Sequence, residues 1–299
     1  MNLTNQQLVF VTGKGGVGKS VAAASIAWSE ARKGKRVCLV ELGSQSFYES
    51  FFEIRGIAYD PSELVPDVHI ALFTPEDCLK EYVLHYVKVK QLYEIFFQNK
   101  VMRAFLNAAP ALAELSILGK LTGALRGIIK SDYDLFVVDC FSTGHALALF
   151  RAPFGLSTVF KSGPLYEQSR DISKILTDPQ LTHYVLVTLA EEMPVVETGE
   201  LISQMRSELK CEPTLICNKL LNPPLTLDQR NQLSLAENDV TMKKFLDYLA
   251  FKEKSQNMQL QAIKGFAHSF YGVPIILNAT SGQDYVEQFA KGLEKLYGI

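Results

Sequence analysis

Short apolar runs recur along the chain at wide intervals, and most of them lack an alternation of polar and apolar positions. Strands that are buried on both faces have this pattern. The runs span Leu8–Thr12, Val37–Val40, Val68–Phe73, Leu135–Val138, Tyr184–Leu189, Thr214–Cys217 and Val273–Leu277. Helical patterns such as Ser20–Lys33 and Val195–Leu209 lie between several of these runs. The alternation of strand and helix predicts an α/β fold with a mostly parallel, doubly wound sheet that helices cover on both faces.

Two intervals, at about residues 76–130 and 225–271, are too long for a simple crossover and have helical composition. We interpret them as helical insertions in a single domain spanning residues 1–299, because the strands on either side must join one sheet. In the first insertion, Tyr82–Phe97 carries more large apolar side chains than one buried stripe needs. In the second insertion the visible apolar stripe consists of Met242, Phe245, Leu246 and Leu249.

A glycine-rich segment follows the first predicted strand and opens the first predicted helix. It matches the phosphate-binding pattern GxxxxGK[ST] and, with the next helical position, comprises Gly13, Lys14, Gly15, Gly16, Val17, Gly18, Lys19, Ser20 and Val21. Glycines let successive backbone N–H groups surround a phosphate, and the helix N-terminus adds partial positive charge. In this pattern Lys19 reaches the β and γ phosphates, and Ser20 offers a hydroxyl to Mg²⁺. The segment therefore predicts binding of a nucleoside triphosphate with Mg²⁺.

The same glycines allow a rival interpretation. Gly13, Gly15 and Gly18 also satisfy the GxGxxG pattern of dinucleotide-binding folds. Glu41, at the end of the second predicted strand, stands where such a fold places its ribose-binding acid. The pair Lys19–Ser20 favours the triphosphate, because a dinucleotide turn requires neither a lysine nor a hydroxyl there.

A phosphate-loop site also needs a carboxylate at the end of another strand, to hold the water shell of Mg²⁺. Asp139 is the candidate, because it closes the apolar run that begins at Leu135. An aspartate at a strand end can instead cap the turn that follows. With the phosphate loop present we favour the metal site, in which Asp139 would act through a water molecule.

Composition and charge exclude several other classes of protein. Thirty Lys and Arg residues against thirty-two Asp and Glu residues give a net charge of −2, so no overall basic field exists to hold nucleic acid. No stretch is long and apolar enough to predict a membrane span, and Met1–Gln7 lacks the basic region of a signal peptide. The five cysteines are odd in number and scattered, as in reduced proteins. We therefore expect a cytoplasmic protein that binds no nucleic acid.

The phosphate loop and the segment after Asp139 resemble those of the arsenite-pump and tail-anchored-protein-targeting ATPases. The resemblance rests on GKGGVGKS with its extra Lys14, and on Asp139 followed by the run STGHALAL. Three further segments are similar to that family, namely Ala71–Tyr82, Val185–Leu201 and Ile216–Lys219. Together these matches span nearly the whole chain.

The resemblance implies an ATP hydrolase that uses ATP and Mg²⁺ and forms a dimer with ATP at the shared face. Lys14 would reach across to the partner's phosphates and act in catalysis with Lys19 and Asp139. Asn218 and Lys219 would lie at the adenine. A switch that senses the γ phosphate would consist of Ser142, Thr143, Gly144 and His145.

In the targeting ATPases, the helical insertions form an apolar groove that opens and closes with the nucleotide state. The resemblance therefore implies a hydrophobic protein client, a membrane partner or an anion pump. The dimer would be a homodimer, or a heterodimer with a related ATPase. A helical subdomain that buries its apolar faces against each other is the alternative interpretation of the insertions.

The first switch departs from the family pattern. Where family members carry an aspartate that positions the attacking water, this chain has Leu42, followed by Gly43. Either Glu41 takes over from the preceding position, or a partner chain supplies a complete switch, or hydrolysis is slow. Two other functions stay open, a positioning ATPase of the Par or Min kind and a nucleotide-binding partner subunit with weak hydrolysis. The cysteines lack the spacing of a zinc-bridged dimer or a metalloid sensor, so we expect isolated thiols.

Overall fold

The computed structural model describes residues 3–86, 110–221, 240–267, 269–293 and 296–298. Within these residues a nine-stranded sheet has the order β3-β4-β2-β5-β1-β6-β7-β8-β9. Its strands are β1 (Leu8–Gly13), β2 (Val37–Leu42), β3 (Ser62–Val65), β4 (Val68–Phe73), β5 (Leu135–Ser142), β6 (Thr182–Leu189), β7 (Thr214–Leu220), β8 (Ser269–Pro274) and β9 (Leu296–Gly298). Neighbouring strands are parallel except at the two edges, where β3 runs antiparallel to β4 and β9 antiparallel to β8.

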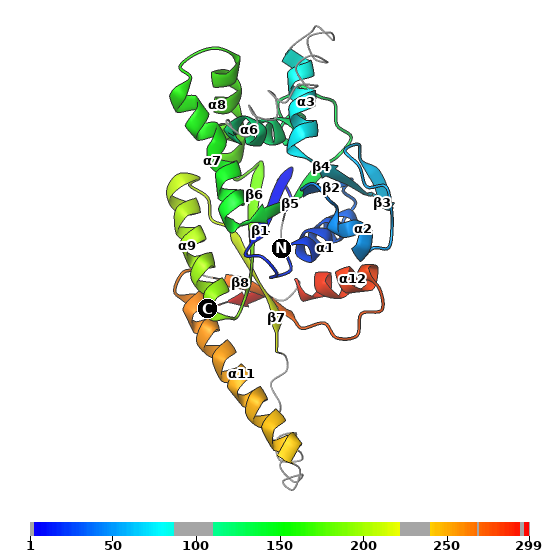
Figure 1. The fold of residues 1–299 in the computed structure, drawn as a ribbon, viewed down its shortest axis with the longest axis vertical. Helices are drawn as coiled ribbons and strands as arrows, with labels where there is room; N and C mark the ends of the chain where they lie inside the picture. Colours follow the sequence, from blue (N-terminus) through cyan, green and yellow to red (C-terminus); the bar gives the residue numbers. More distant parts are fainter. Residues whose placement is uncertain (1–2, 87–109, 222–239, 268, 294–295, 299) are drawn as a thin grey trace.

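Helices cover both faces of this sheet (Figure 1). The described helices are α1 (Lys19–Ala31), α2 (Phe47–Phe51), α3 (Pro75–Tyr86), α6 (Pro110–Leu121), α7 (Thr143–Val159), α8 (Pro164–Thr177), α9 (Glu192–Glu208), α11 (Val240–Lys264) and α12 (Gly282–Gly292). Helices α1, α2 and α12 contribute to one apolar core, whereas α6, α7, α8 and α9 contribute to another. The predicted α/β fold with a mostly parallel, doubly wound sheet is confirmed.

Six of the seven predicted strands lie within β1, β2, β4, β5, β6 and β7. The prediction for Val273–Leu277 was wrong, because the strand at this place is β8 and ends at Pro274. Beyond Pro274 the chain is irregular and Leu277 is 77% exposed, so its apolar residues do not belong to a buried strand. The edge strands β3 and β9 were not predicted. β3 begins with two exposed residues and β9 has three residues, so neither shows the apolar run of a central strand.

The central strands are buried on both faces, and every residue of β1 and β2 is buried. The ring centroid of Phe10 in β1 lies 5.0 Å from that of Phe150 in α7 and 5.6 Å from that of Tyr184 in β6. These distances are typical of favourable aromatic pairs. The aromatic cluster packs α7 against the middle of the sheet, next to the strand that leads into the glycine-rich loop.

Helices α3, α6 and α8 form a layer with α7, which runs from the face of the sheet to beyond its end, at the top of Figure 1. In α6, Leu115, Leu118 and Leu121 are buried, as their helical spacing predicts. Most of the predicted helical segment Tyr82–Phe97 lies outside the described residues. Helices α3 and α6 therefore represent the described part of the first predicted insertion.

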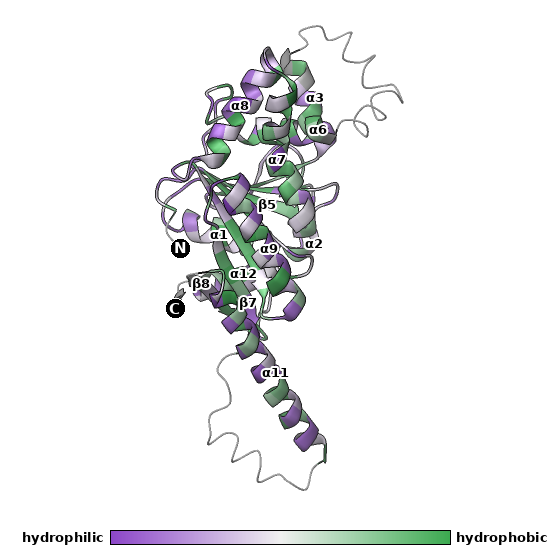
Figure 2. Ribbon diagram, turned by 90° about the vertical axis from the view of Figure 1, so that its left-hand side faces the viewer, coloured by the Kyte–Doolittle hydropathy of each residue, from purple (hydrophilic) through white to green (hydrophobic). Residues whose placement is uncertain are grey.

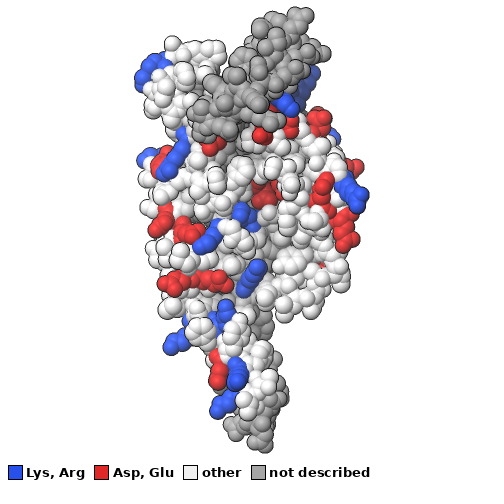
Figure 3. Space-filling model, viewed as in Figure 1, with Lys and Arg blue, Asp and Glu red and all other residues white. Residues whose placement is uncertain are grey.

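Helix α11 projects from the body of the protein and forms the described part of the second predicted insertion (Figure 2). It exposes the large apolar side chains of Val240, Phe245, Tyr248, Phe251 and Met258. Among the described helices, none has both the length and the apolar character that crossing a bilayer requires. On the face seen in Figure 3, positive and negative side chains are interspersed rather than separated by sign.

We predict that Phe150→Ala lowers the free energy of unfolding by about 3–5 kcal/mol, because it leaves a cavity among Phe10, Tyr184 and the sheet. Phe150 is 0% exposed. Phe251→Ala is the matched control, because the Phe251 side chain is 67% exposed on α11. Urea unfolding followed by circular dichroism measures both. Equal effects of the two substitutions would contradict the packing described here.

Candidate functional site

The glycine-rich loop joins β1 to α1 at the edge where the parallel strands end. Gly18 is the N-cap of α1 and has a φ of 97° and a ψ of 31°, a left-handed conformation that favours glycine. A Cβ at Gly18 would lie 2.5 Å from Nδ2 of Asn218, and a Cβ at Gly13 would lie 2.1 Å from the carbonyl oxygen of Val187. These two glycines therefore let the loop lie close against β6 and β7. Between them Gly15 and Gly16 are exposed, so a ligand can reach the backbone of the loop.

Lys19 begins α1, and its Nζ donates a hydrogen bond to the carbonyl oxygen of Lys14 at 3.2 Å. Burial lowers the pKa of Lys19, whereas attraction to Asp139 raises it. The ammonium group is thus held at the loop, in the electrostatic field of the carboxylate. The structure brings together Lys19 and Asp139, two residues that lie far apart in the sequence.

Asp139 lies in β5, paired with Val11 of β1. Burial raises the pKa of Asp139 to about 6, while hydrogen bonding by the Ser20 side chain lowers it. The hydroxyl of Tyr48 donates to Oδ2 of Asp139 at 3.2 Å. In the part of the chain that the structure describes, Oδ1 of Asp139 accepts no hydrogen bond. A buried carboxylate oxygen without a partner is costly, and a ligand that donates to it would remove that cost.

These groups fit a hydrated Mg²⁺ ion. A metal-bound water can donate to Oδ1 of Asp139, and Ser20 carries the hydroxyl that phosphate loops offer to the metal. Within the described ranges, no three His, Cys, Asp or Glu side chains gather in a way that could hold a metal ion. Phosphate oxygens and water would therefore supply the other ligands, as Mg²⁺ prefers.

Lys14 forms an ion pair with Glu197 of α9, with 2.6 Å between Nζ and Oε1. The two side chains are 33% and 30% exposed, so solvent reaches the pair. Glu197 was not predicted as a site residue, because 183 positions separate it from Lys14 and the family-like segment Val185–Leu201 does not reveal that contact. In the structure, Lys14 is thus held by an anion of its own chain.

The first predicted switch lies between β2 and α2. The carboxylate of Glu41 accepts hydrogen bonds from the hydroxyl of Ser46 at 2.5 Å and from the N–H of Phe47 at 2.7 Å. Burial raises the pKa of Glu41, and these hydrogen bonds lower it. The N–H of Gly43 donates to the carbonyl oxygen of Phe73, and Leu42 is 6% exposed within the apolar core. Glu41 therefore holds the start of α2, and its catalytic role stays a prediction.

The second predicted switch is the direct connection from β5 to α7. β5 ends at Ser142 and α7 begins at Thr143, which places Gly144 and His145 in the first helical turn. Gly144 and His145 are exposed, whereas Ser142 and Thr143 are partly buried. This segment continues the strand that carries Asp139 and leads directly into α7.

Asn218 lies in β7 and is 3% exposed. Its Nδ2 donates to the carbonyl oxygen of Val17 at 2.9 Å, and its Oδ1 accepts from the N–H of Lys219 at 2.7 Å. Lys219 has a φ of 55°, and its side chain is exposed. Asn218 thus ties the phosphate loop to β7. The contact of Asn218 and Lys219 with adenine stays a prediction.

The family model described as "Anion-transporting ATPase" matches residues 6–163, which is more than half of the chain. The matched range contains the glycine-rich loop, both predicted switches and Asp139. The chain belongs to this family. As a member it is an ATPase, which uses a nucleoside triphosphate rather than the dinucleotide of the rival interpretation.

Several curated proteins are similar to this member of the anion-transporting ATPase family. "ATPase BagA" from Mycobacterium tuberculosis is 28% identical over 252 residues, which cover 80% of this chain and 72% of the relative. "Arsenical pump-driving ATPase" from Escherichia coli is 24% identical, over 76% of this chain and 41% of the relative. "ATPase asna-1" from Caenorhabditis elegans is 23% identical, over 72% of this chain and 75% of the relative. The resemblance to arsenite-pump and targeting ATPases is confirmed.

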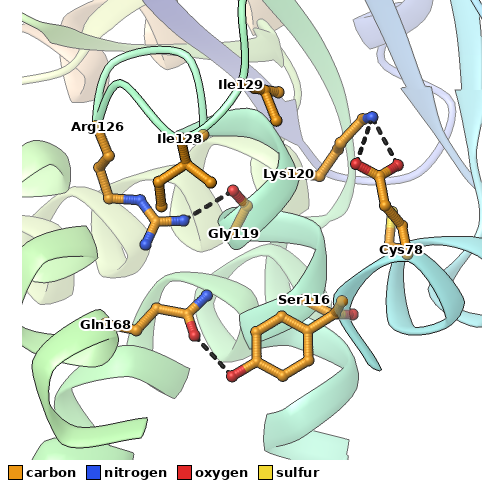
Figure 4. A pocket seen from close by; sticks show the side chains of 11 residues that line it. Cys78, Ser116, Gly119, Lys120, Arg126, Ile128, Ile129 and Gln168 are labelled. Carbon is orange, nitrogen blue, oxygen red and sulfur yellow. Dashed lines mark hydrogen bonds and ion pairs between the residues drawn. The ribbon is translucent and has the colours of Figure 1, made fainter. Parts of the chain in front are cut away.

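A small cavity in the helical layer of this ATPase lies between α3, α6 and α8 (Figure 4). Polar pairs line it: Lys120 pairs with Glu81 at 2.6 Å, the hydroxyl of Tyr82 donates to Gln168, and Arg126 donates to the carbonyl oxygen of Gly119. These groups bind each other across the cavity. Its lining is therefore partly ionic, unlike the apolar groove that the resemblance implies for the insertions.

The five cysteines are described, and four of them, Cys38, Cys78, Cys140 and Cys217, are buried. Cys211 is half-buried. Burial raises the pKa of Cys38, Cys78, Cys211 and Cys217 to about 12. Thiols with such pKa values are protonated at neutral pH and are weak nucleophiles.

We predict that Gly18→Ala weakens ATP binding and lowers the free energy of unfolding, with backbone strain alone costing about 1–3 kcal/mol. The new Cβ would also lie 2.5 Å from Nδ2 of Asn218, and would push that side chain off the loop. Gly15→Ala is the control for stability, because a Cβ at Gly15 meets nothing within 4 Å. Thermal unfolding of both variants measures the difference. Equal destabilisation of Gly18→Ala and Gly15→Ala would show that the close approach of the loop to β7 does not contribute to stability.

Proposed function

We propose that the chain is a Mg²⁺-dependent ATPase that closes as a dimer on ATP and hydrolyses it slowly. The observation that carries this proposal is the buried Asp139 carboxylate, whose Oδ1 has no hydrogen-bond partner among the described residues, while the side chain of Ser20 and the charge of Lys19 both lower its pKa. A phosphate-loop site with this composition is completed by a metal and a triphosphate. Mg²⁺, when bound, neutralises charge on the phosphates and orients them.

Each residue has a distinct task in this proposal. Backbone N–H groups of the loop and the N-terminus of α1 bind the phosphates. Lys19 places its charge on the β and γ phosphates, and Asp139 holds a water of the metal shell. Asn218 keeps the loop against β7, so that the phosphate and base sites move as one unit.

Dimer closure is supported by the position of Lys14. Its ammonium group is partly exposed and paired with Glu197, so an incoming γ phosphate of a partner chain can compete for it. On the same helix as Glu197, Met193 and Val196 are 58% and 50% exposed. Methionine is enriched at the core of protein interfaces, and charged groups lie mainly at the rim. A homodimer satisfies these features, and a heterodimer with a related ATPase is the alternative.

Slow hydrolysis is supported by the first switch. Leu42 is buried in the core and has no group that orients water, while the Glu41 carboxylate is bound at the start of α2. A base must reach the water that it activates. The same observation favours a second candidate function, a nucleotide-binding partner subunit in which a related chain performs most of the hydrolysis.

The helical layer is the proposed output of the nucleotide cycle. Helix α7 continues from the second switch, and it contacts α6 and α8. Loss of the γ phosphate would change the switch, and α7 would transmit that change to the layer. The output would act on a hydrophobic protein client or on a membrane partner that moves an anion.

We predict that Lys19→Ala abolishes turnover and weakens Mg·ATP binding at least about tenfold, because one charge-assisted hydrogen bond to phosphate contributes about 1.5–3 kcal/mol. Lys174→Ala is the control, because Lys174 lies on α8 with a side chain that is 65% exposed. Calorimetric titration measures the affinity for Mg·ATP, and a phosphate-release assay measures turnover. Unchanged Mg·ATP affinity in Lys19→Ala would refute the assignment of the site.

We predict that Glu197→Gln increases the fraction of ATP-bound dimer, because Lys14 loses the anion that holds it in its own chain. Sedimentation velocity at equal protein concentration, with Mg·ATP and with Mg·ADP, measures this fraction. Glu200→Gln on the same helix is the control, since Glu200 is exposed and one helical turn away. A dimer fraction that falls in Glu197→Gln would mean that Glu197 supports closure instead of opposing it.

A further inference from the structure

The hydroxyl of Tyr48 lies between two groups of the proposed metal site. It donates to the carbonyl oxygen of Ser20 at 2.8 Å and to Oδ2 of Asp139 at 3.2 Å. Tyr48 is 0% exposed, so water does not compete for these contacts. The three residues come from three elements, since Tyr48 belongs to α2, Ser20 to α1 and Asp139 to β5.

Helix α2 is held in place by contacts within the chain. Its start is bound by Glu41 through Ser46 and Phe47. The ring of Tyr48 is stacked on that of Phe52, with 5.9 Å between the centroids. The phenol is therefore directed at Asp139 by packing and by hydrogen bonds that involve neither phosphate nor metal.

The geometry leaves the two oxygens of Asp139 with different tasks. A phenol has one proton, and both the Ser20 carbonyl and Oδ2 of Asp139 are acceptors for it. The two acceptors share this proton, so Oδ2 is the oxygen in contact with the phenol, and Oδ1 is the oxygen without a partner among the described residues. A carboxylate held by one oxygen keeps its other oxygen in a fixed direction.

We propose that Tyr48 is a positioning residue that holds Asp139 for the water shell of Mg²⁺ and connects the metal to α2. The inference rests on the proposed function, because Tyr48 would position a residue of the same metal site. The predicted first switch has a leucine in place of the usual aspartate. Through Tyr48, the segment after Leu42 contacts Asp139, the residue proposed to hold the metal's water.

Tyr48 could instead matter only because its ring packs in the core. Two matched variants distinguish this packing role from the positioning of Asp139 by the hydroxyl. Tyr48→Phe removes the hydroxyl and keeps the ring. Tyr184→Phe is the control, because Tyr184 is also buried and its hydroxyl donates to the carbonyl oxygen of Leu176 at 2.9 Å, in the aromatic cluster of the other core. Both variants lose one buried hydroxyl donor.

The experiment titrates Mg²⁺ into the full chain with a fluorescent ATP analogue and reads nucleotide binding rather than turnover. We expect Tyr48→Phe to raise the Mg²⁺ concentration at half-saturation roughly 10- to 100-fold, as for other groups that orient metal ligands. The affinity of Tyr48→Phe for the analogue in EDTA should stay within about twofold of wild type. Tyr184→Phe should match wild type in its Mg²⁺ requirement and in its affinity in EDTA. In an Asp139→Asn background, Tyr48→Phe should add no further change, because its effect passes through Asp139.

An unchanged Mg²⁺ requirement in Tyr48→Phe would overturn the inference while leaving the proposed function intact. An equal loss of affinity with Mg²⁺ and in EDTA would also overturn it, because that result indicates a packing role. If wild type itself bound the analogue without any Mg²⁺ dependence, the proposed function would fail first, and the inference with it. Thermal unfolding of each variant shows that the compared proteins are folded.

Discussion

The fold places a carboxylate where little bulk solvent reaches it, and most of the site can be understood as compensation for that burial. Asp139 is 5% exposed, and burial raises its pKa to about 6. An ionised group in such a place is stable when charges and donors surround it. Lys19 supplies the charge, and Tyr48 supplies a donor to one oxygen. The other oxygen is left for the metal's water, which couples the stability of the site to its ligand.

Lys14 and Lys19, the two lysines of the loop, have different interaction partners. Lys19 is turned back onto the carbonyl oxygen of Lys14 and stays in the field of Asp139. Lys14 pairs with Glu197 at the surface, where a competing anion can reach it. Both lysines are partly buried, so what distinguishes them is the partner, a backbone carbonyl for Lys19 and a carboxylate for Lys14. In the proposed dimer, Lys19 would bind the ATP of its own chain and Lys14 would sense the ATP of the partner.

Local motifs predicted the parts of the site whose chemistry is contiguous in sequence. The apolar runs predicted the central strands because these are buried on both faces, and the glycine pattern predicted the loop because it follows β1 directly. Tyr48 and Glu197 were missed, since each meets its partner through tertiary packing that no short pattern encodes. The edge strand β3 was missed for a related reason, because its outer residues face solvent and carry no apolar signal. The sequence alone does not show that Glu41 binds the start of α2, because an acid at a strand end looks the same whether it activates water or holds a helix.

The most direct test of this account compares the ATP affinity of wild type and Asp139→Asn, each in Mg²⁺ and in EDTA, by calorimetric titration of the full chain. The account predicts that Mg²⁺ tightens ATP binding to wild type and that the variant loses most of this gain while keeping its affinity in EDTA. A variant that retains the full effect of Mg²⁺ would contradict the account, because the buried carboxylate would then have no part in holding the metal.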